Sequence, residues 1–174
     1  APNARSTHRI RELHDRPRGG RVRHFFSACN CLITSLKSNE AAFCTGGDVK
    51  EYDEAYTSRP RDYWKYMGLF RAWIESLVNA GKPVIARING MAAGGGNESQ
   101  LACDLAVMAE HAWLGQVGTR VGSVAAGGAT QWLPIHVGDR RAREMLLLNN
   151  RIPAAQALEW GLVNRVVPSV TKDG

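Results

Sequence analysis

The stretch that decides the fold is "GKPVIARINGMAAGGGNESQLACDLAVMAE", residues 81–110. Residues 83–88 are rich in β-branched side chains, which predicts a buried strand ending at the turn pair Asn89-Gly90. Three consecutive glycines follow at 94–96, then the first turns of a helix over 98–103 and another strand over 105–108. Glycine loses the most backbone freedom on folding, so three together need a reason.

Outward from this stretch, strand-like and helix-like segments alternate at short spacing from Phe43 onward, which predicts an α/β protein. Residues 61–80 form the clearest helix, because apolar residues recur every three or four positions and Pro60 and Gly81 fit its ends. We interpret its periodic residues as core. They are Tyr63, Met67, Phe70, Ile74 and Leu77. Further expected elements are a strand at 113–114, helices at 140–148 and 153–160, and a strand at 162–167.

The composition fits one globular domain, with 174 residues of which 44% are hydrophobic. No apolar run approaches the ~20 residues of a membrane span. The net charge is +6, but residues 1–23 alone carry +5 and leave +1 for the rest. We therefore divide the chain into an unassigned Arg-rich segment, residues 1–40, which is disordered or misread, and a core, residues 41–174. Irregularly spaced cysteines argue against a disulfide framework and a zinc site, although Cys29 and Cys31 lie near His24.

Chemistry is expected at two glycine clusters, Gly46-Gly47 in "AAFCTGGDVKEY" and Gly94 to Gly96. Neither fits a Walker loop or a dinucleotide fingerprint, and no G-x-S-x-G elbow occurs. A strand, a glycine turn and a helix start present unpaired N–H groups to anionic oxygen. Two such turns face to face would make an oxyanion hole, with Glu98 as general acid or base. A tight turn beside a surface Glu98 is the alternative.

Several linked motifs carry a family resemblance over about 125 residues. In addition to the two stretches above, they are "LGQVGTRVGS", "GGATQWLPIHVG" and "RIPAAQALEWGLVNRVVP". In this order and spacing they resemble the crotonase, or enoyl-CoA hydratase/isomerase, superfamily. The resemblance implies a spiral of ββα units that acts on coenzyme A thioesters through a stabilised enolate, without a separate cofactor, usually as trimers or hexamers. Relative to that family the chain is expected to be shortened at both ends.

Carried over by position, the resemblance implies that the backbone N–H groups of Gly47 and Gly95 are the oxyanion donors and that Glu98 is the first catalytic glutamate. Residues expected along the coenzyme A channel are Thr45, Asp48, Val49 and Lys50, the last being equally well a solvated helix residue. The second glutamate of hydratases is replaced by Gly118. A glycine there resembles subfamilies with modified chemistry, including ring-opening 6-oxocyclohexene-carbonyl-CoA hydrolases, whose additional Asp falls where this chain has Val124-Ala125-Ala126. Asp48 or a neighbouring subunit would have to replace the acid.

The expected function is hydration of 2-enoyl-CoA thioesters in fatty-acid or related acyl-CoA degradation, by a lyase in the cytoplasm or, alternatively, the mitochondrion. The alternative reaction is ring-opening hydrolysis of an alicyclic oxo-acyl-CoA in aromatic degradation. Two other classes remain: an RNA-binding protein that uses the basic residues 1–23, and an inactive remnant that binds acyl-CoA. Expected partners are the thioester substrate and further copies of the chain, with no membrane and no nucleic acid.

Overall fold

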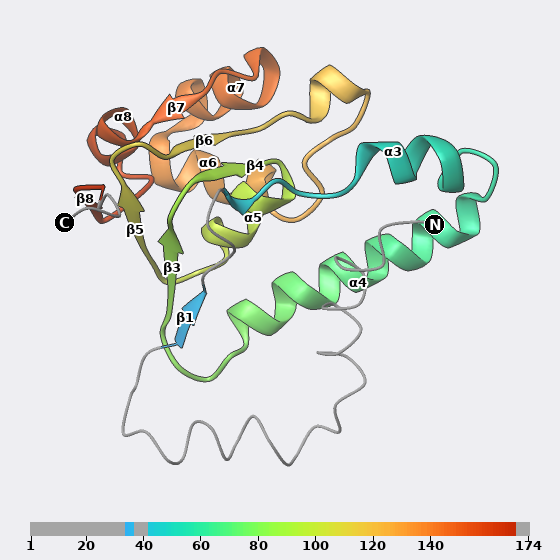
Figure 1. Ribbon diagram of the computed structural model, residues 1–174, viewed down its shortest axis with the longest axis horizontal. Coiled ribbons are helices and arrows are strands. Elements are labelled where there is room, and N and C mark those ends of the chain that lie inside the picture. Colours follow the sequence, from blue (N-terminus) through green and yellow to red (C-terminus); the bar gives the residue numbers. More distant parts are fainter. Residues whose placement is uncertain (1–33, 37–41, 170–174) are drawn as a thin grey trace.

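The computed structural model describes residues 34–36 and 42–169 (Figure 1). The expectations for the Arg-rich start, and for a cysteine and histidine metal site near Cys29, lie outside the described residues.

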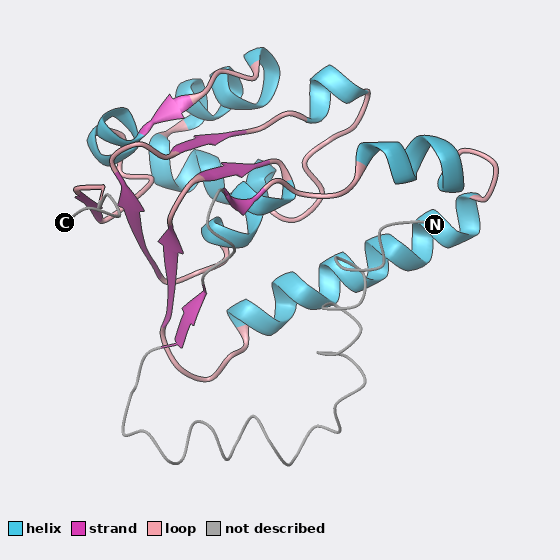
Figure 2. Ribbon diagram, in the orientation of Figure 1, coloured by secondary structure: helices cyan, strands magenta, loops and turns pink. Residues whose placement is uncertain are grey.

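Two four-stranded sheets form the centre of the fold (Figure 2). The first sheet is parallel throughout, in the order β1-β3-β5-β8. Its strands are β1 (Thr34–Leu36), β3 (Val84–Ile88), β5 (Leu105–Ala109) and β8 (Arg165–Val167). In the second sheet, order β2-β4-β6-β7, the last strand alone is antiparallel to its neighbour. Its strands are β2 (Ala42–Cys44), β4 (Met91–Ala93), β6 (Trp113–Gly115) and β7 (Ile152–Pro153).

The chain builds these sheets by repeating one unit, two strands followed by helix. Each repeat adds one strand to each sheet, so β1 and β2, β3 and β4, and β5 and β6 are successive pairs. The helical segments after the first pair are α3 (Val49–Glu51), the π-helix η1 (Tyr52–Tyr56) and α4 (Pro60–Val78); α5 (Gly95–Leu101) follows the second pair. After the third come the 3₁₀ turn η2 (Gly118–Val121), α6 (Ala129–Val137) and α7 (Asp139–Leu148), and α8 (Ala154–Glu159) lies between β7 and β8. This arrangement confirms the expected spiral of ββα units.

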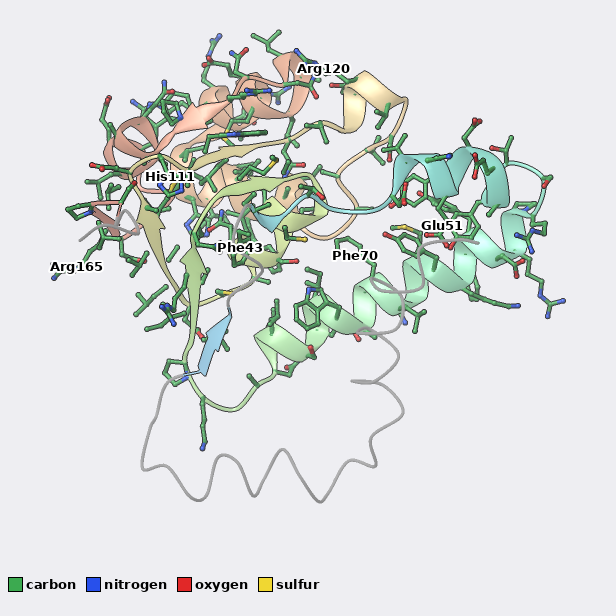
Figure 3. The ribbon with its side chains drawn as sticks, viewed as in Figure 1. Phe43, Glu51, Phe70, His111, Arg120 and Arg165 are labelled. Carbon is green, nitrogen blue, oxygen red and sulfur yellow. The ribbon has the colours of Figure 1, made fainter. Side chains whose placement is uncertain are left out.

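The core lies between the sheets and the helices that cover them. In β3, Val84, Ala86 and Ile88 are buried while Arg87 is exposed, the alternation of a strand with one face in the core. Other fully buried large side chains are Phe43 of β2 (labelled in Figure 3), Met108, Leu114, Leu133 and Met145. Each such burial contributes about 1.5–3 kcal/mol, so these strands and helices fix the positions of the loops between them.

The interpretation of the periodic residues of helix α4 as core is correct only for the C-terminal half of the helix. Ile74 and Leu77, in its C-terminal half, pack with Val84 and Ala102 as expected. Tyr63 and Met67 belong to the same periodic stripe but line a pocket instead, and Phe70, between them and Ile74, both lines that pocket and packs against this core cluster. Figure 1 shows the reason, because the N-terminal half of α4 extends past the sheets alongside α3. The stripe therefore faces core at one end of the helix and the pocket at the other.

Some boundaries also differ from expectation. Strand β4, η1 and α6 were not expected, and Pro134 within α6 masks its helical pattern. The strand expected from residue 162 begins only at Arg165. The Leu162 N–H donates instead to the Ala157 carbonyl at the end of α8, at 2.8 Å, and the side-chain Oδ1 of Asn164 accepts from the Ala106 N–H at 2.8 Å in place of a backbone carbonyl. Within residues 34–36 and 42–169, no helix is long and apolar enough to cross a membrane.

Candidate active site

The two glycine clusters meet at the ends of β2 and β4, as expected of turns that face each other. Gly46 has a positive φ of 83°, and a Cβ built on it would lie 3.0 Å from the backbone nitrogen of Gly95. The same Cβ would lie 3.2 Å from the carbonyl oxygen of Ala93. Any side chain at Gly46 would therefore push the turns apart, and with them the backbone of Gly47 and Gly95.

The three glycines of the triplet differ in what restricts a side chain at each position. Gly94 has a φ of 55°, in the region that favours glycine. A Cβ on Gly96 would overlap the carbonyl oxygen of Cys44, a backbone atom of β2. A Cβ on Gly95 would lie 3.2 Å from the ring of Phe70 and 3.5 Å from the Cα of Gly46. Gly94 and Gly96 are thus required by the backbone of the fold, whereas the nearest neighbour of a side chain at Gly95 would be the ring of Phe70.

Glu98 is the buried acid of the site. It lies in α5 with a relative exposure of 3%, so the alternative of a surface glutamate is wrong. Its Oε1 accepts hydrogen bonds from the N–H of Gly127 at 2.7 Å and of Ala129 at 3.1 Å. Burial raises the pKa of this carboxyl above its ordinary value, and the two backbone hydrogen bonds oppose that rise. A carboxyl with a raised pKa can exchange protons nearer neutral pH.

A pocket opens between the glycine turns, α4 and the loop after β6. Six of the predicted site residues line it: Thr45, Gly47, Val49, Gly95, Glu98 and Gly118. Phe70 forms part of its wall and points from α4 toward the rest of the fold (Figure 3). The structure thus brings the predicted oxyanion donors and the predicted acid to one cavity, while their catalytic roles stay predictions.

Helix α4 is fastened beside the pocket by a short hydrogen-bond chain. The Trp73 indole N–H donates to Ser99 Oγ at 3.0 Å, and that hydroxyl donates to the carbonyl oxygen of Gly95 at 2.8 Å. The wall that carries Phe70 is therefore tied to the same helix that carries Glu98.

Asp48 and Lys50 do not line the pocket. The Asp48 carboxylate caps α3 by accepting from the N–H groups of Lys50 at 3.0 Å and Glu51 at 3.3 Å. Lys50 forms an exposed ion pair with Glu54 at 3.5 Å. The solvated-helix interpretation of Lys50 thus has a contact in its favour, and substrate-binding roles for both residues remain predictions.

Gly118, at the position of the second glutamate of hydratases, has no room for a side chain. A Cβ there would lie 2.9 Å from the carbonyl oxygen of Ser123, whose own N–H donates to the Gly118 carbonyl at 2.8 Å. Among the described residues that line the pocket, Glu98 is the one carboxylate, and Val124, Ala125 and Ala126 add none. Asp48 does not line the pocket and its carboxylate caps α3, so its part as the replacement acid stays a prediction.

Several residues that line the pocket were not predicted as site residues, among them Tyr52, Tyr63, Tyr66 and Gln116. Tyr63 and Tyr66 have a helical spacing in α4, as Tyr52 and Tyr56 do in η1, a signal that indicates core as readily as a site. Gln116 is 3% exposed, and its Nε2 has no hydrogen-bond partner among the described residues. No spacing rule separates Gln116 from a core amide.

Within residues 34–36 and 42–169, no group of three His, Cys, Asp or Glu side chains could hold a metal ion.

Two sheets built from ββα repeats, with facing glycine turns and a buried glutamate at their edge, define a crotonase-type fold. The family model for enoyl-CoA hydratase/isomerase matches residues 31–172, and the chain belongs to that family of enzymes.

Relatives of two kinds agree with this assignment. The 6-oxocyclohex-1-ene-1-carbonyl-CoA hydrolase of Thauera aromatica is 41% identical over 154 residues, 86% of this chain and 41% of that protein. The protein of the same name from Geobacter metallireducens is 41% identical over 135 residues, 78% of this chain and 35% of that protein. The crystal structure of an enoyl-CoA hydratase from Bacillus anthracis has 36% sequence identity and a TM-score of 0.73, covering 84% of this chain and 58% of that one. The chain thus spans less than half the length of these two curated relatives.

Proposed function

We propose that this chain binds a coenzyme A thioester and adds water to it through an enolate, and that the acyl group is an alicyclic ring with an oxo group. The observation that carries the proposal is a single buried carboxylate, Glu98, in the pocket that Gly47 and Gly95 line. The Thauera and Geobacter relatives, whose names give an oxo-cyclohexene thioester as substrate, support the choice of ring.

The first step proposed is addition of one water across the ring double bond. The thioester oxygen accepts from the Gly47 and Gly95 N–H groups, which stabilises negative charge as the α-carbon becomes an enolate; such donors contribute roughly 3 kcal/mol each. Glu98 takes the proton from the water as its oxygen bonds to the β-carbon. The same carboxyl then gives the proton to the α-carbon. One acid is enough for this sequence, which fits the glycine at position 118.

Ring opening would follow by hydrolysis. A second water bonds to the carbon of the ring ketone, and the bond between that carbon and the α-carbon breaks. The electron pair of that bond goes to the α-carbon as a thioester enolate, the species that the two N–H donors stabilise. The α-carbon takes a proton and the former ketone carbon becomes a carboxyl group, so the oxyanion hole serves both steps.

Hydration of a linear 2-enoyl-CoA is the second candidate. It is favoured by the match to the enoyl-CoA hydratase/isomerase family and by the similarity to the Bacillus anthracis hydratase. It needs the same oxyanion donors and Glu98, without ring cleavage.

To test this, the purified chain is incubated with 6-oxocyclohex-1-ene-1-carbonyl-CoA and, separately, with crotonyl-CoA. The masses of the products are measured by mass spectrometry. Ring opening adds the mass of two waters, and linear hydration adds one. We expect two waters on the cyclic thioester. Product from crotonyl-CoA alone would favour the second candidate, and no product from either would contradict both and support a remnant that binds acyl-CoA.

A further inference from the structure

The feature that the proposed reaction leaves unused is a cluster of four tyrosines beside Gly47. Tyr52 and Tyr56 come from η1, Tyr63 and Tyr66 from α4, and every pair of rings is in contact, with centroids 5.4–6.3 Å apart. Three of the four line the pocket, whereas Tyr56 does not. A Cβ built on Gly47 would collide with the hydroxyl oxygen of Tyr52 and lie 2.5 Å from that of Tyr66. Two phenol oxygens therefore lie against the Cα of Gly47, whose N–H is one of the predicted oxyanion donors.

The hydroxyl pair of Tyr52 and Tyr66 has one O–H donor that has no acceptor among the described residues. Tyr52 donates to the Tyr66 oxygen at 2.9 Å. Within residues 34–36 and 42–169, the Tyr66 O–H has no acceptor of its own. The hydroxyl of Tyr56, by contrast, donates to Glu51 at 3.0 Å. A hydroxyl is one donor and two acceptors, so the Tyr52–Tyr66 pair offers the pocket one free O–H and spare lone pairs.

The pair can act only as a donor of hydrogen bonds, not as a base, near neutral pH. Burial raises the pKa of Tyr52 above its ordinary value, and the hydrogen bond with Tyr66 raises it further. Burial also raises the pKa of Tyr66, with the hydrogen bond from Tyr52 opposing. Both phenols stay protonated, so the ligand atom that suits them is an oxygen that accepts, in a part of the pocket otherwise walled by rings.

We propose that the Tyr52–Tyr66 hydroxyl pair binds a second carbonyl oxygen of the acyl group, one that is separated from the thioester carbonyl by a single carbon atom. The inference rests on the proposed function, because it takes the thioester oxygen to be held at Gly47 and Gly95. When two carbonyls share one neighbouring carbon, their oxygens can point to the same side. An oxygen held at the Gly47 N–H then places the other near the phenol oxygens that lie against Gly47.

This contact separates two classes of substrate. A 2-enoyl thioester without an oxo group leaves the free O–H unpaired, which weakens its binding relative to an oxo thioester. A hydrogen bond to the ring ketone also draws electron density from its carbon, which favours attack by water there. Tyr66 and Tyr52 are therefore specificity residues for the oxo group.

The test measures dissociation constants of the 174-residue chain for two thioesters that differ only in the oxo group, 6-oxocyclohex-1-ene-1-carbonyl-CoA and cyclohex-1-ene-1-carbonyl-CoA. Calorimetry is done with wild type, Tyr66→Phe and Tyr52→Phe, each checked for folding by circular dichroism. Tyr56→Phe is the matched control, since it removes a phenol of the same cluster that faces Glu51. We expect Tyr66→Phe and Tyr52→Phe to weaken the oxo thioester roughly tenfold or more while the oxo-free thioester changes less than twofold.

Equal affinity of the wild type for the two thioesters, including no measurable affinity for either, overturns the inference, as does an equal loss for both in Tyr66→Phe. Turnover is followed in the same samples. If the wild type prefers the oxo thioester, loses that preference in Tyr66→Phe and yet converts neither compound, the inference stands and the proposed function fails.

Discussion

Glu98 of α5 is hydrogen-bonded through its Oε1 to the backbone N–H of Gly127, 29 residues later in the chain, at 2.7 Å. A Cβ on Gly127 would lie 2.9 Å from the other carboxyl oxygen and 2.6 Å from the Phe70 ring. The Glu98 carboxylate is therefore held on one side by the Gly127 amide and bordered on another by the Phe70 ring. Its second oxygen, Oε2, can reach a substrate from few directions.

Replacement of this acid tests its proposed role most directly. Glu98→Gln keeps the shape and the Oε1 acceptor for Gly127 and Ala129 but cannot carry a proton. We expect kcat to fall roughly a hundredfold to ten-thousandfold, the usual effect of losing a general acid or base. Glu159→Gln, which neutralises an exposed glutamate of α8, is the control. Normal turnover by Glu98→Gln would rule out proton transfer by this residue.

The same variant makes a prediction about stability. Because burial raises the pKa of Glu98, the folded chain keeps a proton that the unfolded chain has already lost at pH values between the ordinary and the raised pKa. Stability contributed by the neutral form is full below the unfolded pKa and falls as pH rises through this interval. The free energy of unfolding of Glu98→Gln minus that of the wild type should therefore increase across the interval and level off above it. Urea unfolding at several pH values measures it, and a difference independent of pH would contradict the raised pKa.

Adjacent glycines of the triplet should respond differently to the same substitution. Gly96→Ala would drive a methyl into the Cys44 carbonyl, so we expect a loss of about 1–3 kcal/mol in unfolding free energy. In Gly95→Ala the methyl would lie 3.2 Å from the Phe70 ring and 3.5 Å from the Gly46 Cα, which a small shift of the ring accommodates, so we expect near-normal stability and reduced turnover. Gly68→Ala, in α4 with nothing within 4 Å of the new Cβ, is the control and should stabilise by about 0.5–1 kcal/mol. Thermal melts and turnover of the three variants check this, and equal melting temperatures for Gly95→Ala and Gly96→Ala would contradict it.

Restoring the missing glutamate should not restore a two-acid hydratase. In Gly118→Glu the Cβ would press on the Ser123 carbonyl, so we expect a loss of about 1–3 kcal/mol and no gain in crotonyl-CoA hydration. Val124→Glu adds the same carboxylate to the same loop at a side chain that is 78% exposed, and we expect it to fold like wild type. A faster hydration by Gly118→Glu, followed at the absorbance of the conjugated thioester, would show that the loop adapts.

Asp48 can be assigned to capping or to substrate binding by two variants. Asp48→Asn keeps a side-chain acceptor for the Lys50 and Glu51 N–H groups, whereas Asp48→Ala loses it at about 1 kcal/mol of local stability. If capping is its role, the alanine variant should raise KM by loosening the segment that carries Tyr52, and the asparagine variant should not. A KM raised equally in both would indicate that the charge contacts the substrate.

Strands β3, β5 and β6 and the glycine turns could be predicted from sequence because they follow from local patterns, whereas the three-residue strand β4 was not expected. The β-branched run that became β3 and the positive-φ turn at Gly94 need few distant contacts to interpret. The site residues were harder to predict from sequence wherever their role depends on how deeply the side chain is buried. Glu98 and a surface glutamate look alike in sequence, and only the packing of Gly127 and Ala129 over α5 separates them. Met67 and Ile74 likewise share one helical stripe, and what each faces depends on where α4 passes the edge of the sheets.

The tyrosine cluster has a spectroscopic consequence. The chain contains four tyrosines, and all four rings contact one another beside the pocket. The change in ultraviolet absorbance when phenols ionise therefore arises at one place in the molecule. Burial and the contact with Glu51 raise the pKa of Tyr56 to about 12, and those of Tyr52 and Tyr66 are raised as well. An alkaline titration of the unlabelled protein thus reports on this one wall, and a bound acyl group that shields it would delay the transition.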